Sequence, residues 1–162
     1  MFHRRHAIYC FLILIWLATN AWSAEPNLVG VWKFVKEVDR HADGSILEGA
    51  PPDGYKGQII YTSNGYMSVQ IFPVGRKWLL GTATREDLKN TLYLSSSYFG
   101  RYEVDTAASE VTHKVISNLD PSGETENYKR HYKLSGDELI LTGNWEEGGE
   151  QFSFEVTWQR VK

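Results

Sequence analysis

The chain has 162 residues and a formal net charge of −3, from 17 basic and 20 acidic residues, which excludes the basic excess that nucleic-acid binding requires. Its single cysteine, Cys10, excludes an intramolecular disulfide and a zinc site built from cysteines. A chain of this length, with 14% aromatic residues, can form one domain around a core of its own.

The N-terminal residues have the pattern of a secretory signal peptide. A basic leader precedes an apolar run at residues 7–18, which is too short to span a bilayer comfortably. Ala21 and Ser23 supply the small residues of a cleavage site. We predict a signal peptide at residues 1–23 and a secreted or periplasmic domain at 24–162, with no stable membrane anchor after cleavage. An uncleaved anchor is the alternative.

Strand-like alternation of apolar and polar residues dominates the rest of the chain. The first strand is predicted at 28–38, and the Gly/Pro-rich residues 39–56 predict a loop. Strands at 57–62 and 66–72 flank Asn64-Gly65, a pair that favours a tight hairpin because it tolerates positive φ. Further strands are predicted at 98–105, 110–117, 126–134, 138–144 and 152–160.

Residues 84–97 interrupt this alternation and predict one short helix. Thr84 suits the N-cap, with Asp87 three residues later, and Leu88 and Leu92 share one face. We expect this helix to lie across an end of the sheet. Eight strands in up-and-down order predict an all-β fold, an antiparallel barrel that has no exposed sheet edges. The interior of such a barrel holds packed side chains or one small ligand.

A histidine is predicted to face the barrel interior. Val111, His113 and Val115 share one face of their strand, and the apolar neighbours mark that face as the inside. His113 could move a proton or hydrogen-bond a ligand. Alternatively, a tyrosine or a backbone carbonyl satisfies it within the core.

An arginine is predicted to face inward on a neighbouring strand. Arg130 alternates with Tyr128 and Tyr132, and a guanidinium that cannot lose its proton needs an anion when it is buried. That anion is either an internal carboxylate, with Glu103 as one candidate, or a ligand. The alternation of Glu103 with Tyr102 and Val104 points it outward instead.

Tyrosines are the predicted walls of the interior, because each combines apolar area with one polar tip. They suit an ordinary core equally well. Four are candidates: Tyr61, Tyr102, Tyr128 and Tyr132. The sequence has no nucleophile elbow, phosphate-binding glycine loop or paired-histidine metal motif, so we expect no metal and no cofactor.

A series of short stretches carries a family resemblance: Leu28–Trp32, Gly57–Thr62 with Gly65–Gln70, Tyr98–Asp105, Val111–His113, Gly136–Thr142 and Trp158–Arg160. On these stretches the sequence resembles the lipocalin-like domain family, whose members are small calycin-type β-barrels. The resemblance implies a central cavity but no single activity, since many members have no known function. It also implies that Trp32 packs under Arg160 and closes one end of the barrel.

The leading functional hypothesis is binding of a small lipophilic or acidic molecule inside the barrel. His113 and Arg130 would hold its polar group between the four tyrosines. One alternative is a cofactor-independent isomerase or cyclase, in which His113 moves a proton and Arg130 stabilises negative charge. Another is a filled barrel that acts through its surface or the loop at 39–56. The sequence carries no signal for an oligomeric state.

Overall fold

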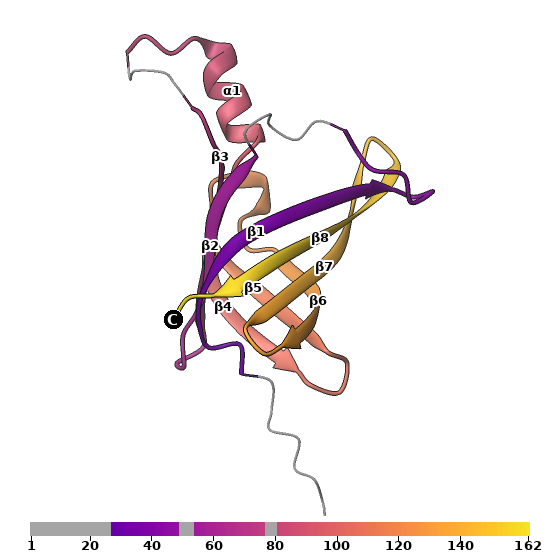
Figure 1. Cartoon of the computed structure of the whole chain (residues 1–162). Coiled ribbons are helices and arrows are strands. Elements are labelled where there is room, and N and C mark those ends of the chain that lie inside the picture. The colour runs from indigo at the N-terminus through magenta and orange to yellow at the C-terminus, as the bar shows by residue number, and fades with distance from the viewer. Residues whose placement is uncertain (1–26, 49–53, 77–80) are drawn as a thin grey trace, which may run out of the picture.

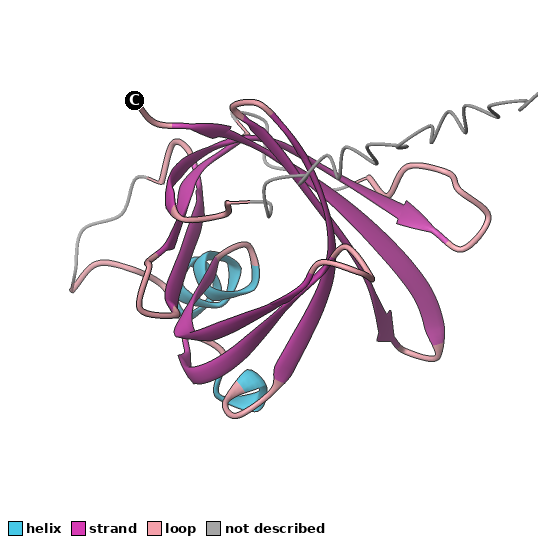
Figure 2. Cartoon of the chain, turned by 90° about the horizontal axis from the view of Figure 1, so that it is seen from below, coloured by secondary structure: helices cyan, strands magenta, loops and turns pink. Residues whose placement is uncertain are grey.

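The computed structural model describes residues 27–48, 54–76 and 81–162 (Figure 1). The predicted signal peptide lies outside the described residues. Within them, eight antiparallel strands form a closed barrel in which each strand pairs with the next and the last pairs with the first, which confirms the predicted all-β fold (Figure 2). The strands are β1 Gly30–His41, β2 Tyr55–Tyr61, β3 Tyr66–Pro73, β4 Ser96–Asp105, β5 Glu110–Asn118, β6 Asn127–Ser135, β7 Glu138–Glu147 and β8 Glu150–Arg160.

Strand β1 is longer than predicted. It continues to His41 because its last residues stay paired with β8, where His41 lies opposite Phe152. The connection to β2 is therefore shorter than the predicted loop at 39–56. The predicted tight turn at Asn64-Gly65 joins β2 to β3, and Gly65 has a φ of +82°, which glycine adopts without strain.

A β-bulge in β1 changes which of its side chains face the interior. Trp32 and Phe34 are buried, as even-numbered residues of an inward face. The pairing with β8 then shifts between Phe34 and Lys36. One extra residue in a strand reverses the alternation beyond it. After the bulge, the odd-numbered Glu37 and Asp39 line the interior space.

The end of the barrel that contains Trp32 is closed by packing. Trp32 has no exposed surface, and its Nε1–H donates a hydrogen bond of 2.9 Å to the carbonyl of Leu28. The guanidinium of Arg160 lies 4.0 Å from the centroid of the Trp32 ring system and donates to the carbonyls of Val29 and Asn27. The structure thus places together the two residues that the family resemblance pairs.

The opposite end of the barrel carries helix α1, Arg85–Tyr93, and the short 3-10 helix Pro121–Gly123. The predicted N-cap is confirmed, since Thr84 and Asp87 form a reciprocal capping box. The helix ends before Ser96, which already belongs to β4, so the predicted range of 84–97 is too long.

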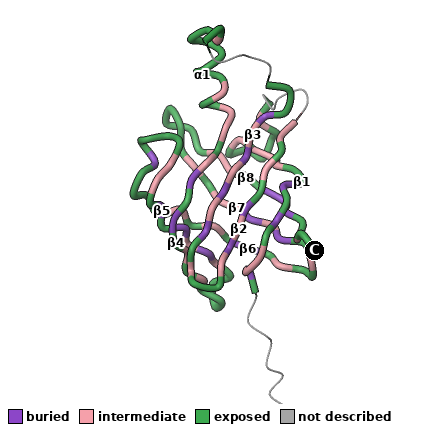
Figure 3. Tube along the Cα trace, turned by 90° about the vertical axis from the view of Figure 1, so that its left-hand side faces the viewer, coloured by how far each residue is buried: buried purple, intermediate pink, exposed green. Residues whose placement is uncertain are grey.

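The expectation that α1 lies across an end of the sheet is wrong, because the helix projects beyond the barrel and buries none of its residues (Figures 1 and 3). Leu88 is 43% exposed and Leu92 is 54% exposed. Within the described residues, no helix has the length and apolar character that crossing a bilayer requires.

Candidate functional site

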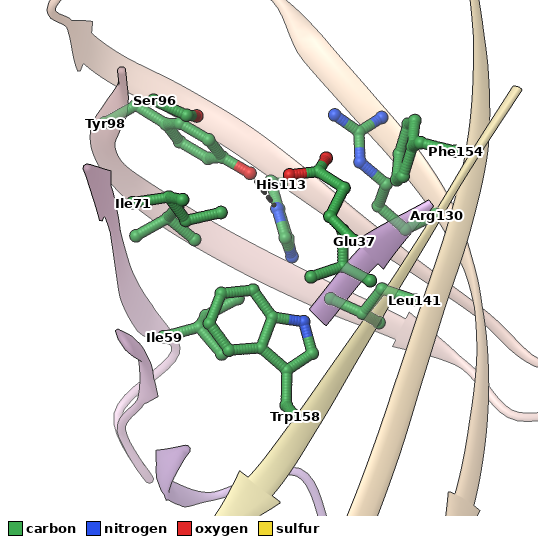
Figure 4. Close-up of a pocket in the computed structure, with 12 residues that line it drawn as sticks. Glu37, Ile59, Ile71, Ser96, Tyr98, His113, Arg130, Leu141, Phe154 and Trp158 are labelled. Atoms are coloured by element: carbon green, nitrogen blue, oxygen red, sulfur yellow. Dashed lines mark hydrogen bonds between the residues drawn. The ribbon is translucent and has the colours of Figure 1, made fainter. Parts of the chain in front are cut away.

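A cavity lies inside the barrel, between the closed end and the α1 end (Figure 4). This inner cavity has a volume of about 120 Å³. Its apolar lining consists of Ile59, Val69, Ile71, Leu141, Phe154, Val156 and Trp158. Its polar lining consists of Glu37, Ser96, Tyr98, His113 and Arg130. The inner cavity is therefore lined by both apolar and polar side chains.

A second pocket of about 360 Å³, the mouth pocket, adjoins the inner cavity on the side of the α1 end. The two spaces share Glu37, Arg130 and Phe154. The mouth pocket is further lined by Asp39, Tyr128, Asn144 and Trp145. Glu37 and Arg130 consequently stand at the junction of the two spaces.

His113 is held between two tyrosine hydroxyls in the wall of the inner cavity. Its side chain is only 1% exposed, Nε2 lies 2.7 Å from the hydroxyl of Tyr61, and Nδ1 lies 2.8 Å from the hydroxyl of Tyr98. Burial, aided by the positive charge of Arg130, lowers the pKa of His113 to about 3. The neutral ring has one N–H and one lone pair, so one tyrosine accepts a hydrogen bond from it and the other donates. The core alternative for His113, satisfaction by tyrosine, thus matches the geometry.

Neither tyrosine partner ionises at physiological pH. Burial raises the pKa of Tyr98 to about 12, although Arg130 is close enough to oppose that rise. Burial also raises the pKa of Tyr61 well above its ordinary value. Both hydroxyls therefore act only as neutral hydrogen-bonding groups, and Tyr98 carries this network to the surface of the inner cavity.

Arg130 lies on β6, half-buried at the junction of the two pockets. Its guanidinium carbon is 5.0 Å from the centroid of the Tyr128 ring and 4.8 Å from that of Phe154. Nη1 donates to the carbonyl of Lys129 at 3.0 Å. Among the described residues, no carboxylate forms an ion pair with Arg130. Glu103, the predicted internal candidate, is exposed and pairs with Lys114 on the outside of the barrel.

Two carboxyl groups on β1 that alternation did not reveal, Glu37 and Asp39, line the mouth pocket together with Arg130. Burial raises the pKa of Glu37, Asp39 raises it further and Arg130 lowers it, with a result of about 7. Burial also raises the pKa of Asp39, whose Oδ1 is buried without a hydrogen-bond partner among the described residues. If the alternation that starts at Trp32 continued along β1, Glu37 would point outside the barrel. It points inward because of the bulge between Phe34 and Lys36, which the sequence does not show.

The four predicted wall tyrosines occupy different heights in the barrel. Tyr128 lines the mouth pocket, and its hydroxyl accepts a hydrogen bond from Asn118 at 3.0 Å. Tyr61, Tyr102 and Tyr132 line neither pocket. The hydroxyl of Tyr61 is hydrogen-bonded to Nε2 of His113, and Tyr102 packs on Tyr61 with ring centroids 4.8 Å apart. Tyr132 is buried in the core.

Tyr98 is the tyrosine of the inner cavity, and it was not among the predicted site residues. Its place four residues before Tyr102 on the same face of β4 could have indicated that it points inward. The predicted strand began at Tyr98, however, so no preceding residues of the strand supported that assignment. The described residues contain no cluster of three histidine, cysteine or acidic side chains that could hold a metal ion.

A closed eight-stranded barrel, packed shut at one end and hollow toward the other, defines the class of small barrels that can enclose one ligand. The family model of the lipocalin-like domain matches residues 29–161, so the chain belongs to the lipocalin-like domain family. No curated protein gives a significant sequence match to the chain.

Proposed function

We propose that the chain is a secreted or periplasmic binding protein that holds one small, partly apolar molecule inside its barrel. The class of ligands that fits includes acidic molecules. The observation that carries this proposal is the inner cavity, lined by apolar and polar side chains, with Arg130 at its junction with the mouth pocket. Membership of the lipocalin-like domain family supports it at the level of the fold. The N-terminal sequence pattern supports the secreted location.

The dimensions of the two spaces suit a small ligand. The inner cavity of about 120 Å³ is close to the roughly 150 Å³ of an engineered apolar cavity that binds benzene. The mouth pocket of about 360 Å³ lies within the range of about 300–1,000 Å³ that is typical of ligand pockets. A ligand can therefore place a compact apolar group inside and its polar group at the junction.

Binding accounts for the state of His113 better than catalysis does. An isomerase or cyclase would use His113 to exchange a proton with its substrate, and a general base works best with a pKa near the operating pH. Burial holds the pKa of His113 near 3, and both ring nitrogens are engaged by tyrosines. We therefore assign His113 a supporting role, in which it positions the hydroxyl of Tyr98 at the cavity wall.

Native mass spectrometry of the protein recovered after secretion of the full chain tests this function. We expect a reproducible added mass that is lost on denaturation, and a protein mass consistent with cleavage before Ala24. Arg130→Gln should raise the Kd for this ligand by roughly tenfold or more and thereby lower its occupancy, since a charge-assisted hydrogen bond contributes about 1.5–3 kcal/mol.

Arg101→Gln is the matched control, because Arg101 lies exposed on the outer surface over the ring of Tyr66. It removes the same charge outside the barrel and should leave occupancy unchanged. A bare protein mass, together with strong destabilisation by Arg130→Gln, would instead support a filled barrel that acts through its surface.

A further inference from the structure

We propose that the ligand is a small carboxylic acid whose carboxylate binds Arg130 beside a protonated Glu37, so that binding takes up one proton. This inference rests on the proposed binding function and specifies its ligand class. It also makes Glu37 the residue that couples binding to pH.

The placement of the two charged groups is the first step. Glu37 on β1 and Arg130 on β6 line both the inner cavity and the mouth pocket, and both reach toward the space beside the hydroxyl of Tyr98 (Figure 4). They are the only residues with ordinarily charged carboxylate or guanidinium groups in the described lining of the inner cavity. A polar ligand group at the junction must therefore meet both of them.

The chemistry of these groups favours an anion over a cation. A guanidinium stays charged at any physiological pH, whereas a carboxyl group can become neutral by taking up a proton. The junction can thus adapt to a ligand carboxylate by neutralising Glu37. It has no corresponding way to neutralise Arg130 for an ammonium group, which would remain beside a like charge.

Even without a ligand, the surroundings of Glu37 keep its carboxyl group protonated and uncharged in part of the molecules near neutral pH. Its pKa is raised to about 7, first by burial and then by the charge of Asp39. A ligand carboxylate adds a further negative charge and shares the field of Arg130, so it raises the pKa of Glu37 again. The ionisable groups around Glu37 are Asp39 on β1, Tyr55 on β2, Tyr98 on β4, His113 on β5, and Tyr128 and Arg130 on β6.

Within this group of residues, Glu37 is the one whose pKa is placed near neutral pH, at about 7. Burial places the pKa values of Tyr98 and His113 at about 12 and about 3, far from the physiological range. Strands β7 and β8 contribute the uncharged Asn144, Trp145 and Phe154 to the mouth pocket. A proton taken up on binding near neutral pH is therefore assigned to Glu37.

The apolar side chains of the lining set the size of the ligand body. Ile59, Leu141 and Trp158 are among those that surround a space close in volume to a cavity that holds one benzene molecule. A monocarboxylic acid with one compact ring or a short branched chain fits this space. Phenylacetate is a suitable probe, and its uncharged amide and phenethylamine test the charge of the polar group.

Calorimetric titration of the secreted protein with these three compounds tests the inference. We expect phenylacetate to bind at least about tenfold more tightly than either analogue, as one charge-assisted contact allows. Titrations in buffers of different ionisation enthalpy should give uptake of nearly one proton at about pH 8 and almost none at about pH 6. The Kd should accordingly rise by up to about tenfold per pH unit above the pKa of Glu37.

Glu37→Gln imitates the protonated carboxyl group and isolates its contribution. The variant should bind phenylacetate with no proton uptake, and its Kd at about pH 8 should equal that of the unmodified protein at about pH 6. Glu103→Gln is the matched control, because Glu103 is exposed on the outer surface. It should retain both the pH dependence and the proton uptake.

The outcomes separate this inference from the proposed function. Equal binding of acid and amide without proton uptake would leave a binding barrel but overturn the acidic ligand and the role of Glu37. Tighter binding of phenethylamine would overturn the choice of an anion. If none of the three binds and native mass spectrometry shows no added mass, the proposed function itself fails. A native ligand that lacks an acidic group would also overturn the inference.

Discussion

Replacement of His113 by phenylalanine is expected to lower the free energy of unfolding by about 2–6 kcal/mol. The substitution leaves the hydroxyls of Tyr61 and Tyr98 without their partner, and each unsatisfied buried group costs about 1–3 kcal/mol. Phenylalanine keeps an aromatic ring in the space, so the loss reports mainly on the hydrogen bonds. Chemical denaturation followed by tryptophan fluorescence measures it.

His131→Phe is the control for this measurement. His131 is exposed on β6 and faces the outside of the barrel, so its replacement should change the free energy of unfolding by less than about 0.5 kcal/mol. A loss for His113→Phe that is no larger than this would contradict the assignment of His113 as the centre of a buried network.

The same variant should alter the acid sensitivity of the fold. The pKa of His113 is about 3 in the folded chain and about 6.5 in the unfolded chain, so the unfolded chain binds the proton first. As the pH falls from about 6.5 toward 3, the unmodified protein should lose about 1.4 kcal/mol per pH unit through this group. Above pH 6.5 the group should have no effect.

The difference between the two proteins isolates this effect, because the carboxyl groups titrate in both. Between about pH 6 and pH 4, the stability of His113→Phe should fall less steeply by about 1.4 kcal/mol per pH unit. Parallel curves for the two proteins would show that His113 accepts a proton within the fold, against the geometry of its two hydrogen bonds.

The inward direction of His113 and Arg130 could be predicted because β5 and β6 keep an unbroken alternation through both residues. The same counting fails on β1. A bulge inserts one residue between Phe34 and Lys36 and reverses the faces beyond it. Because no glycine or proline marks that position, the inward direction of Glu37 could not be predicted from the sequence. Glu37 is the group on which the proposed pH dependence rests.

The tyrosines show a second limit of alternation. It assigns a side chain to a face but gives no height along the barrel axis. Tyr98 and Tyr102 share the inner face of β4, yet only Tyr98 reaches the inner cavity. The height depends on the stagger between all neighbouring strands, which becomes fixed only when the barrel closes. For this reason the sequence predicts that Tyr132 faces inward, but it does not predict that Tyr132 lies outside the lining of the inner cavity.

Replacement of Trp32 by alanine is expected to cost about 3–5 kcal/mol of stability, the range for removing a large aromatic side chain from a core. Trp32 is fully buried, and its removal also leaves the carbonyl of Leu28 without its donor and Arg160 without the ring beneath it. Chemical denaturation again measures the loss.

A double-mutant cycle with Arg160→Met separates the contact with Arg160 from the rest of this cost, because methionine keeps much of the apolar stem without the charge. The coupling between Trp32 and Arg160 should be about 0.5–2 kcal/mol. The exposed pair of Arg101 and Tyr66 has a similar separation of 4.4 Å, and Tyr66→Phe first removes the hydrogen bond of 2.8 Å that Arg101 donates to the Tyr66 hydroxyl. The coupling that remains for this exposed pair is expected at the lower end of that range. Additive effects at Trp32 and Arg160 would contradict a cation–π contribution to the closure.

The closed end also provides an internal test of where the ligand binds. Trp32 and Arg160 line neither the inner cavity nor the mouth pocket, so the surviving folded fraction of either variant should bind phenylacetate with the Kd of the unmodified protein. Glu37→Gln should instead change the pH dependence of binding without any loss of stability, because it removes the cost of ionising a buried carboxyl group. Loss of affinity in Trp32→Ala under conditions where it is fully folded would mean that the closed end shapes the cavity, and that stability and binding share one set of contacts.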